Sequence, residues 1–576
     1  MKVRHIEIRN FRGIKYLSWN VKSVFACLIG PGDTCKTTIL TALDYALSPR
    51  TSLSFDDSDF FNQETEEQIV IQVTLAEWDE TRPAIQSLFE ERKFAQYKCG
   101  LGTNGPVTEP ADDAPVAVSV SLRVDRGLEP KWWIVKGRDE FEEQERKQIY
   151  ATDRATLGLS RLDLYSDYHF TWGRNSILTR LSAGTEGNLE AVLSELTRDL
   201  RAIDISSYPS IAECQTVADS VKTEVNVVGV RLTTLSPKVD IQRQSIGAGA
   251  LSLHEDNVPL RNKGSGTKRL IGAAMQMKLH GGKNVSLIDE IEIGLEPHRI
   301  RGLIHRLRNS PQQIFATTHS PVVIRELDVG ANELYVCKRD VGGTVTVQSL
   351  STVSDIQGAV RVNAEAFLGS TIIACEGPTE IGCLRAYDLY RLDRNDPPVW
   401  SLSTSYFNCG GASNIVPLCT QLMQLGYKTA VLCDSDAPDQ LSEADVQGLR
   451  RAGAYVCQWE EGHSTEEQLA AELPWEHVPA LLRLVSDAHD TIDYATILDG
   501  IRKAARLAPL SLGEDPATWP EALVIRQGIG QCMKDGKWIK RIAYAQQVLA
   551  FAFLYLPADS TMLSRLDALW RWIQSE

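Results

Sequence analysis

Two pairs of carboxylates stand at the ends of apolar runs in the last third of the chain. Glu376 and Glu380 follow one run, and Asp434 and Asp436 follow the next. Carboxylates at the C-terminal ends of neighbouring parallel strands converge on one crevice, and residues spaced i, i+2 point to one side of a strand. Four anions this close repel one another unless cations share the site, so Mg²⁺ or Mn²⁺ is the natural partner. Such a site can activate water in phosphodiester hydrolysis. The simpler alternative is a set of separate surface carboxylates.

A third acidic segment, residues 459–467, follows a further apolar run at 454–457. We select Glu466 as an additional metal-binding carboxylate, with Glu467 nearly as good a candidate. The competing interpretation is helix capping, because a serine such as Ser464 followed by glutamates is typical of a helix N-terminus.

A glycine-containing turn near the N-terminus has the composition of a phosphate-binding loop. It offers backbone N–H groups, a lysine for the β- and γ-phosphates, a hydroxyl for Mg²⁺ and a helix that starts at the anion. Cys35 departs from the pattern, which has glycine there, and its Cβ is expected to crowd the backbone. The alternative is an ordinary strand-to-helix turn. The candidate nucleotide-binding residues are Gly30, Gly32, Asp33, Thr34, Cys35, Lys36, Thr37 and Thr38.

Three distant segments carry residues that suit the same site. Asp289 and Glu290 end an apolar run, which is the arrangement that holds Mg²⁺ and polarises an attacking water in phosphoryl transfer. His319 follows the next apolar run, and the basic segment 263–269 opens a helix that offers a second anion site. Each segment alone has an ordinary explanation, but their order along the chain is hard to explain by chance.

These residues need strands and helices that bring them together. Alternation predicts strands within the first 25 residues, and an apolar strand at 24–29 leads through the turn into a helix at 36–46. Residues 176–222 have helical periodicity, which predicts an antiparallel helix pair. A second α/β unit opens at Thr371. Further strands are predicted at 67–76, 116–124, 284–289 and 312–317.

The composition excludes several classes of protein. The chain has 576 residues, 43% of them hydrophobic and 23% charged, which is too long for a single small binding module and too apolar for global disorder. The net charge is −15, and residues 371–576 carry 27 acidic and 17 basic side chains. A uniformly basic nucleic-acid coat is therefore excluded, and a DNA-binding groove must use local basic patches such as 261–269 and 534–541.

The sequence also indicates where the protein works. Met1 is followed by charged residues rather than a signal-peptide core, and no apolar run approaches 18 residues. The twelve cysteines form no CxxC pair. We therefore expect a cytoplasmic protein with no membrane association and no structural zinc.

The N-terminal constellation resembles the ABC-type ATPase heads of the SMC and RecF kind, whose opening strand ends in an Asn-Phe-Arg-Gly run like that at 10–13. In such heads the signature completes the site of a facing subunit, so one copy of each element implies at least a homodimer. The resemblance assigns Lys36 and Thr37 to Walker A, Asp289 and Glu290 to Walker B, His319 to the switch histidine, 294–297 to the D-loop and Ser265 with Gly266 to the signature.

The acidic constellation resembles the Toprim domain of topoisomerases, primases and certain nucleases. An ATPase head joined to a Toprim domain in a chain of this length resembles the OLD (overcoming lysogenisation defect) nuclease family, to which the GajA subunit of the Gabija defence system belongs. The resemblance implies catalytic roles for Glu376, Asp434 and Asp436, and metal ligation by Glu376, Glu380, Asp434, Asp436 and Glu466.

Second-class members of that family carry a late catalytic lysine in a Trp-aromatic-Lys context. Residues 538–540 are similar, with Ile539 in place of the aromatic residue. The resemblance gives the catalytic role to Lys540, whose ammonium near the scissile phosphate would stabilise developing charge. The alternative is a basic helix face that contacts the DNA backbone or solvent.

The resemblance implies an α/β fold with an ABC-type ATPase head, an inserted helical dimerisation segment and a Toprim Rossmann-like domain. The expected function is that of an ATP-binding DNA endonuclease dependent on Mg²⁺ or Mn²⁺, acting in anti-phage defence or DNA processing. The alternative is a RecF-like ATP-dependent DNA clamp or sensor without nuclease activity. Expected partners are DNA, a second copy of the chain and, from the Gabija resemblance, a helicase-like protein. The expected domain bounds are 1–175 and 226–368 for the ATPase, 176–225 for the helical insert and 369–576 for the Toprim domain.

Overall fold

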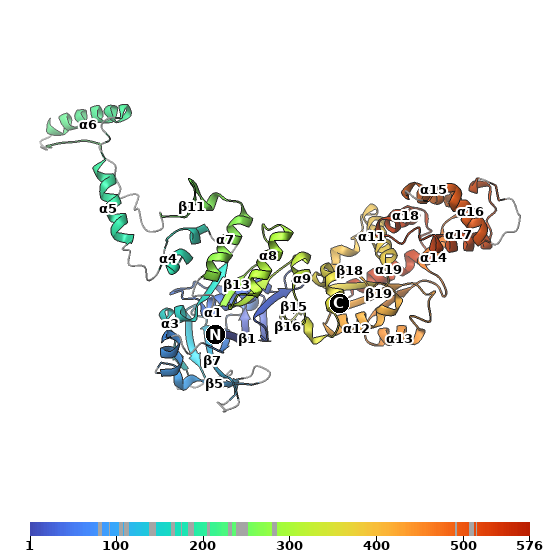
Figure 1. The fold of residues 1–576 in the computed structure, drawn as a ribbon, viewed down its shortest axis with the longest axis horizontal. Helices are drawn as coiled ribbons and strands as arrows, with labels where there is room; N and C mark the ends of the chain where they lie inside the picture. The colour runs from blue at the N-terminus through green and yellow to red at the C-terminus, as the bar shows by residue number, and fades with distance from the viewer. Residues whose placement is uncertain are drawn as a thin grey trace.

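The computed structural model of the chain consists of two lobes in a line, with two helices projecting from the N-terminal lobe (Figure 1). Two large sheets build the N-terminal lobe, and a four-stranded sheet with adjoining helices builds the C-terminal lobe. The described residues are 1–78, 83–91, 93–102, 107–108, 114–136, 146–162, 167–173, 176–182, 189–203, 205, 208–227, 233–237, 251–278, 285–489, 492–505, 512–513 and 515–575.

The first sheet is antiparallel and has the strand order β2-β1-β4-β7-β5-β6, with β8 and β9 continuing from β7. The strands predicted at 67–76 and 116–124 are confirmed as β4 and β7. The strands are β1 (Lys2–Phe11), β2 (Ile14–Asn20), β4 (Ile69–Ala76), β5 (Cys99–Leu101), β6 (Val107–Thr108), β7 (Val116–Val124), β8 (Pro130–Val135) and β9 (Arg146–Gln148).

The second sheet has the order β10-β13-β14-β3-β15-β16 and is parallel except for β16. All residues of β3, β13 and β14 are buried, as expected of parallel strands covered on both faces. Ile288 pairs with Ala316, and Thr317 pairs with Leu28, so the strand ends that carry the candidate residues share one edge. The strands are β3 (Phe25–Ile29), β10 (Leu159–Leu162), β13 (Val285–Ile288), β14 (Gln313–Thr317), β15 (Leu334–Arg339) and β16 (Val345–Ser349).

Helices flank this sheet and confirm the helix predicted at 36–46, which is α1 (Lys36–Leu47). Helix α1 packs between the two sheets, since it contacts β4 and β7 on one side and β10 and β14 on the other. The remaining elements of the lobe are α2 (Pro83–Ile85), α3 (Ala151–Leu157), β11 (His254–Glu255), β12 (Val258–Pro259), α7 (Ser265–Lys278), α8 (Pro297–Arg308) and α9 (Pro321–Glu326).

The prediction of an antiparallel helix pair at 176–222 is wrong. The segment forms α4 (Ile177–Leu181), α5 (Leu189–Ala202) and α6 (Pro209–Val227), and α5 and α6 meet at an angle away from the lobe (Figure 1). Val192, Leu196 and Leu200 lie along one side of α5 and stay 53%, 50% and 39% exposed. A helix pair needs two facing apolar stripes, and α6 is built mainly of small and polar residues.

The C-terminal lobe contains a wholly parallel sheet with the order β18-β17-β19-β20. Cys375 pairs with Leu432, and Cys433 pairs with Gln458, so the residues after these strands lie at one edge. The elements are β17 (Thr371–Cys375), α11 (Pro378–Asp393), β18 (Thr404–Asn408), α12 (Ile415–Gln424), β19 (Lys428–Cys433), α13 (Glu443–Arg451), β20 (Tyr455–Gln458), α14 (Thr465–Glu472) and α19 (Thr561–Gln574).

Further helices extend this lobe, and close packing fixes them to the sheet's own helices. Helix α18 lies against α11, where a Cβ on Gly382 would come within 2.4 Å of the Cβ of Ala545. Helix α17 lies against α14, where a Cβ on Gly530 would lie 2.9 Å from the Cα of Glu467. The added helices are α15 (Val478–Ala488), α16 (Tyr494–Ala504), α17 (Leu523–Asp535) and α18 (Ile542–Tyr555).

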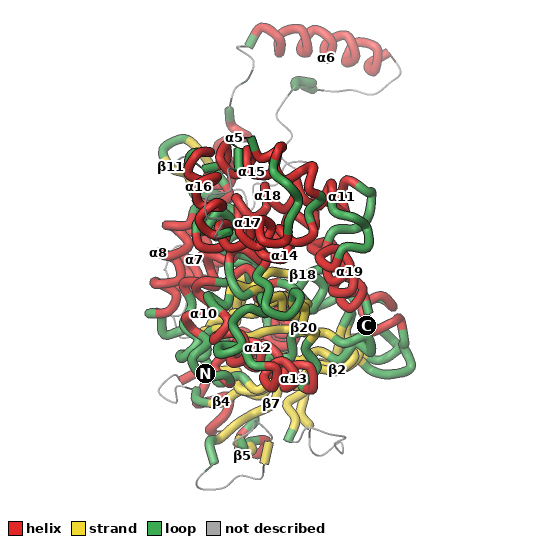
Figure 2. The backbone as a smooth tube through the Cα atoms, turned by 90° about the vertical axis from the view of Figure 1, so that its right-hand side faces the viewer, coloured by secondary structure: helices red, strands yellow, loops and turns green. Residues whose placement is uncertain are grey.

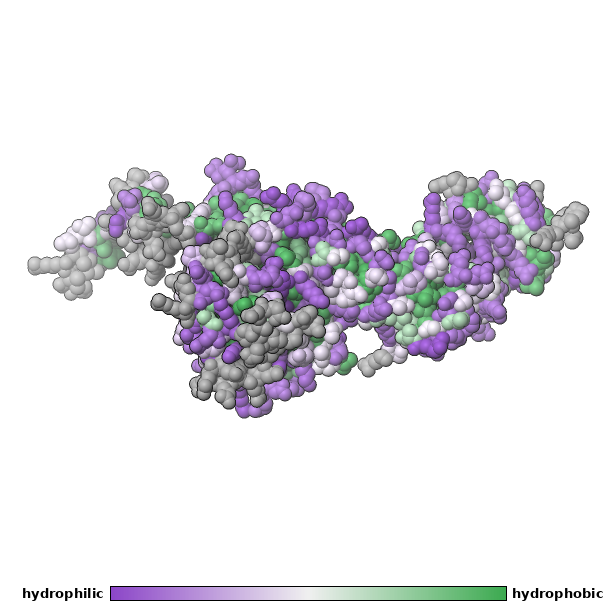
Figure 3. Space-filling view, turned by 60° about the horizontal axis from the view of Figure 1, so that its bottom comes forward, coloured by the Kyte–Doolittle hydropathy of each residue, from purple (hydrophilic) through white to green (hydrophobic). Residues whose placement is uncertain are grey.

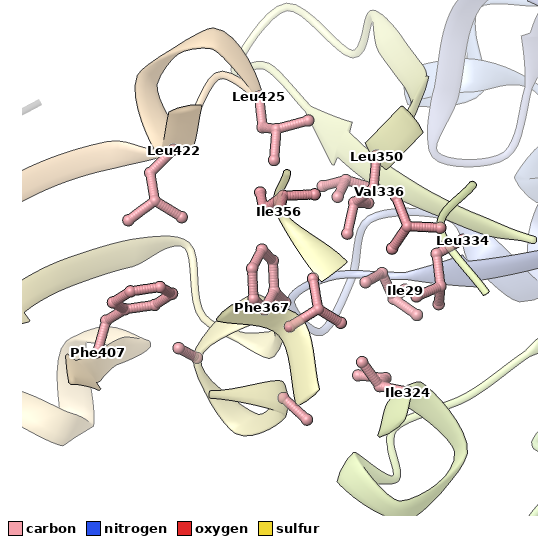
Figure 4. Close-up of a cluster of buried hydrophobic side chains, with 14 of the residues drawn as sticks. Ile29, Ile324, Leu334, Val336, Leu350, Ile356, Phe367, Phe407, Leu422 and Leu425 are labelled. Carbon is pink, nitrogen blue, oxygen red and sulfur yellow. The ribbon is translucent and has the colours of Figure 1, made fainter. Parts of the chain in front are cut away.

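One continuous hydrophobic core joins the two lobes (Figure 4). Phe367 lies at its centre, after α10 (Gln357–Val362), and its ring packs against the rings of Phe407 and Tyr427 in the C-terminal lobe. Ile356 packs in the same core from the connecting segment. The lobes are therefore packed together rather than tethered. The other labelled members are Ile29, Ile324, Leu334, Val336, Leu350, Leu422 and Leu425.

The surface is largely polar on the face drawn in Figure 3, where hydrophilic residues cover most of both lobes. Among the described helices, none is long and apolar enough to cross a membrane. The twelve cysteines are free thiols.

Candidate functional site

The turn between β3 and α1 wraps around the ammonium group of Lys36. Its Nζ donates to the carbonyl oxygens of Gly30 (3.0 Å) and Pro31 (2.5 Å) and to Thr34 Oγ1 (3.2 Å). Burial lowers the pKa of Lys36. Gly30 has a φ of +129°, and a Cβ there would lie 2.6 Å from the carbonyl oxygen of Cys337 in β15. The turn therefore needs glycine at this place, and it holds one buried cation where a phosphate would approach.

A cavity of about 550 Å³ opens over this turn. Arg339, at the end of β15, lines the cavity and donates from Nε to the carbonyl oxygen of Gly13 at 2.7 Å. Arg339 carries no recognisable motif, and only the pairing of β15 with β3 brings it here. The remaining lining residues are Gly32, Asp33, Thr34, Cys35, Lys36, Thr37, Thr38 and His319.

Cys35 occupies its position in a strained backbone conformation. Its φ of +66° lies in the left-handed region that glycine adopts without cost. A Cβ on Gly13 would lie 2.8 Å from Cys35 Sγ, so the side chain fits because the facing residue is glycine. Burial raises the pKa of the Cys35 thiol, which keeps it protonated.

Asp289 and Glu290 lie beside the first turn of α1. Asp289 Oδ1 accepts hydrogen bonds from Thr37 Oγ1 (3.1 Å) and Thr317 Oγ1 (2.6 Å). The backbone N–H of Glu290 donates to Thr317 Oγ1 at 2.8 Å. This arrangement places a threonine hydroxyl and an aspartate together, which is the pair that Mg²⁺ uses in P-loop NTPases.

His319 is exposed and lines the same cavity. Its backbone N–H donates to Glu292 Oε1 at 2.8 Å, and the neighbouring Thr318 donates to Glu292 Oε2 at 2.7 Å. Burial and the nearby Lys36 lower the pKa of His319, so its imidazole is neutral near pH 7. Glu292, which the sequence motifs did not single out, thus fixes the position of the histidine.

Ser265 and Gly266, the predicted signature, are not among the residues that line this cavity. They begin α7 and pack against Gly294, because a Cβ on Gly266 would lie 2.0 Å from the Gly294 carbonyl oxygen. Arg269 of the same helix donates to the carbonyl oxygens of Asp289 and Glu290. The predicted signature is therefore tied to the back of the acidic strand end rather than to the nucleotide cavity of its own chain.

The carboxylates of the C-terminal lobe come together in a largely buried cluster. Asp434 is 8% exposed, Glu380 is 2% exposed and Glu466 has no exposed surface. Thr465 Oγ1 lies 2.9 Å from Asp434 Oδ1 and 3.3 Å from Glu380 Oε1. The backbone N–H of Asp434 donates to Glu376 Oε2 at 3.3 Å. Glu376 and Asp434 therefore face each other across the ends of β17 and β19.

Burial and mutual repulsion raise the pKa values of the acids in this cluster. Burial is the larger cause of the raised pKa at Glu376, Glu380 and Asp434, and the neighbouring carboxylates raise each pKa further. Both carboxylate oxygens of Glu466 are buried without a hydrogen-bond donor. An uncompensated buried charge costs several kcal/mol, so this cluster is arranged for cations.

Two lysines supply positive charge at the cluster. Lys540 Nζ lies 3.2 Å from Glu466 Oε1, and Lys534 Nζ lies 2.6 Å from Asp436 Oδ2 and 3.4 Å from Glu467 Oε2. Burial lowers the pKa of both lysines, but the carboxylates raise each pKa by more, so both stay protonated. The sequence placed Lys534 only in a basic patch, because nothing local links α17 to Asp436.

The glutamates at 466 and 467 have different surroundings. Glu467 closes a capping box with Ser464, since its Oε2 accepts from the Ser464 backbone N–H at 2.9 Å and its own N–H donates to Ser464 Oγ. Glu466 points away from the cap and into the cluster beside Lys540. Helix capping and membership of the acidic cluster therefore belong to adjacent residues.

Two segments of the chain match families of AAA ATPases. Residues 1–105 match the family described as "AAA ATPase domain", and residues 218–325 match "AAA domain, putative AbiEii toxin, Type IV TA system". The first segment contains Lys36, and the second contains Asp289 and His319. The N-terminal lobe thus carries an AAA-type ATPase domain, which implies nucleotide binding, usually with Mg²⁺.

Two solved structures of SMC heads are similar over most of their own length. One is a "SmcHead bound to the C-winged helix domain of ScpA", with 13% identity, a TM-score of 0.36, and 61% of this chain and 99% of that chain covered. The other is an "Smc head domain with an extended coiled coil bound to the C-terminal domain of ScpA derived from Pyrococcus furiosus", with 12% identity, a TM-score of 0.33, and 62% and 99% covered. No curated protein matches the chain in sequence.

Proposed function

We propose that the chain is an ATP-binding, divalent-metal-dependent DNA endonuclease of the OLD type. In this proposal residues 1–175 and 226–368 form the ATPase head, 176–225 the dimerisation insert, and 369–576 a Toprim nuclease domain. The observation that carries it is the burial of Glu380, Asp434 and Glu466 in one cluster at the C-terminal edge of a parallel sheet. Ligand sites of open α/β sheets lie at that edge.

The donor set of the cluster fits Mg²⁺ or Mn²⁺, because every available ligand is a carboxylate oxygen and those of Glu466 have no hydrogen-bond donor. Among the described side chains, no three of His, Cys, Asp or Glu already enclose one ion. Binding would therefore require side-chain rotation, for which the partly exposed Glu376 and Asp436 have room. The residues that would hold metal are Glu376, Glu380, Asp434, Asp436 and Glu466. Bound metal would supply activation of water and charge stabilisation.

The remaining residues of the cluster position charge. Lys540 stays protonated and projects from a turn held by buried Trp538 and Ile539, whose carbonyl oxygen accepts a hydrogen bond from Thr379 Oγ1 at 3.1 Å. Its ammonium would stabilise negative charge on the scissile phosphate. Thr465 fixes the Asp434 carboxylate through Oδ1, which leaves Oδ2 for a ligand.

In the ATPase head, Lys36 would contact the β- and γ-phosphates, Thr37 and Asp289 would hold Mg²⁺, and Glu290 would orient water beside His319. We further propose a homodimer, because the predicted signature lies outside its own cavity and the apolar stripe of α5 has no cover within the described chain. A cytoplasmic role in anti-phage defence with a helicase-like partner follows from the family resemblance.

A plasmid-nicking assay with a matched pair of variants tests this function. With Mn²⁺ or Mg²⁺ the wild type should convert supercoiled plasmid to nicked or linear DNA. Asp436→Asn should abolish conversion, whereas Asp439→Asn, an exposed aspartate three residues later, should leave it intact. Absence of nicking by the wild type, together with tight DNA binding, would favour a RecF-like clamp instead.

A further inference from the structure

An arginine-lined groove runs along the free edge of the C-terminal sheet. Strand β20 ends the order β18-β17-β19-β20, so in the described part of the chain one of its edges pairs with no strand. A hollow of about 620 Å³ follows this edge, between α13 and Arg565 of α19. Figure 2 shows α13, β20 and α19 on the same side of the molecule.

Three guanidinium groups gather at the groove without carboxylate partners in the described structure. Arg450, from α13, donates only to the Val456 carbonyl oxygen, at 3.4 Å. Arg571 donates to a carbonyl oxygen of its own helix, and Arg565 has no hydrogen bond from its side chain. All three act on the phenol of Tyr455, whose pKa burial raises and these charges lower.

The groove also has acidic and aromatic walls. Glu443 accepts a hydrogen bond from Gln447 at 2.7 Å, and Glu461 lies at the end nearer the carboxylate cluster. Tyr455 stacks on Trp572, with ring centroids 5.5 Å apart and an interplanar angle of 29°. Unpaired guanidinium groups beside a stacked aromatic pair are suited to phosphates and bases together.

The groove opens directly onto the carboxylate cluster. Ser435, which lines it, lies between Asp434 and Asp436 in the chain. Trp459 lines it as well, and its Nε1 donates at 2.7 Å to Thr465 Oγ1, the hydroxyl that also contacts Asp434. One wall of the groove is therefore the rear of the proposed catalytic site.

We propose that this groove binds the backbone of a single DNA strand that extends from the scissile phosphate. Arg450, Arg565 and Arg571 would contact successive phosphates, and the Tyr455–Trp572 pair would stack against an unpaired base. A single strand fits better than a duplex, because the hollow follows one sheet edge and stacking requires an unpaired base. The inference rests on the proposed nuclease function and deepens it by assigning the path of the substrate.

Fluorescence anisotropy with a labelled oligonucleotide of about 12 nucleotides tests the groove apart from catalysis. The assay uses the full chain in EDTA, so that no cleavage occurs. Arg450→Glu/Arg565→Glu should weaken binding at least about tenfold and reduce the slope of log K against log salt by about one to two contacts. Arg565→Lys should keep most of the affinity, and thermal unfolding should report an intact fold.

Arg483→Glu, on the exposed side of α15, is the matched control because it changes the same charge outside the groove. Wild-type affinity and salt slope in the double variant would overturn the proposal, and so would an equal loss in the control, which would reveal only a general charge effect. Failure of the nuclease function would appear differently, as nicking by Asp436→Asn, and would leave these binding results in place.

Discussion

Lys540 Nζ lies 3.2 Å from Oε1 of Glu466, a side chain with no exposed surface. The contact joins the turn after α17 to the first turn of α14, although 74 residues separate the two in the chain. Glu466 has no hydrogen-bond donor, so the ammonium group is its counter-charge among the described residues. A charge buried with one movable cation is suited to exchange that cation for a metal or a phosphate-bound lysine, and this view motivates the predictions below.

Lys540→Ala should lower plasmid nicking by about 100-fold or more, because removal of one preorganised charge at a transition state costs on that order. Lys537→Ala is the control, since Lys537 is exposed in the same turn and contacts no carboxylate of the cluster in the described structure. Initial rates of supercoil loss at saturating Mn²⁺ measure both. Equal rates for the two variants would assign Lys540 to a solvent-facing basic surface.

The acidic cluster should make metal-free stability fall as pH rises. The raised pKa of Glu380 means that the folded state binds more protons than the unfolded chain above the ordinary glutamate pKa of about 4.3, so stability drops as pH rises towards the folded value. In EDTA, the unfolding midpoint of Glu380→Gln should fall less than that of the wild type over this range. Gln keeps an acceptor for the Gly377 N–H.

Addition of Mn²⁺ should reverse this trend for the wild type, because bound metal stabilises the ionised acids and binds only the folded state. Differential scanning fluorimetry from pH 4 to 8 measures both effects. Parallel curves for wild type and Glu380→Gln, with and without Mn²⁺, would show that the cluster is neither strained nor metal-binding.

Cys35→Gly should tighten ATP binding several-fold, because glycine removes the left-handed strain and the Cβ beside the phosphates. Gly13→Ala should weaken binding, since its Cβ would lie 2.8 Å from Cys35 Sγ. The double variant should bind better than Gly13→Ala alone, and isothermal titration of a non-hydrolysable ATP analogue measures the cycle. Additive effects across the cycle would mean that the two residues do not interact.

Phe367→Ala should destabilise the whole chain by about 3–5 kcal/mol, because it opens a cavity at the centre of the core that joins the lobes. Val341→Ala, at a side chain 93% exposed, should change stability by less than about 0.5 kcal/mol. Chemical denaturation, followed in both lobes by site-specific probes, measures the difference. Loss of stability in only one lobe would show that the shared core does not couple them.

Local patterns predicted the parts of the fold in which chemistry follows directly from a strand end. The strands before Lys36, Asp289, Glu376 and Asp434 are fully apolar and buried on both faces, so their ends were visible in the sequence. Strand pairing then brings these ends to common edges.

Contacts between distant elements were not predictable in this way. Arg339 reaches the nucleotide cavity only because β15 pairs with β3, and Lys534 reaches Asp436 only through the packing of α17 on α14. Periodicity identified the helices at 176–222, but it carries no information on whether they pack together. Val192 and Leu196 show that they do not cover each other.

The most direct test of the proposed nuclease is the rate of Mn²⁺-dependent plasmid nicking by Asp434→Asn, measured alongside its affinity for ATP. Asp434 lies at the centre of the acidic cluster, held by Thr465, and far from the P-loop in the chain. The account predicts a rate at least about 100-fold below wild type with unchanged ATP affinity. Nicking at the wild-type rate would contradict it.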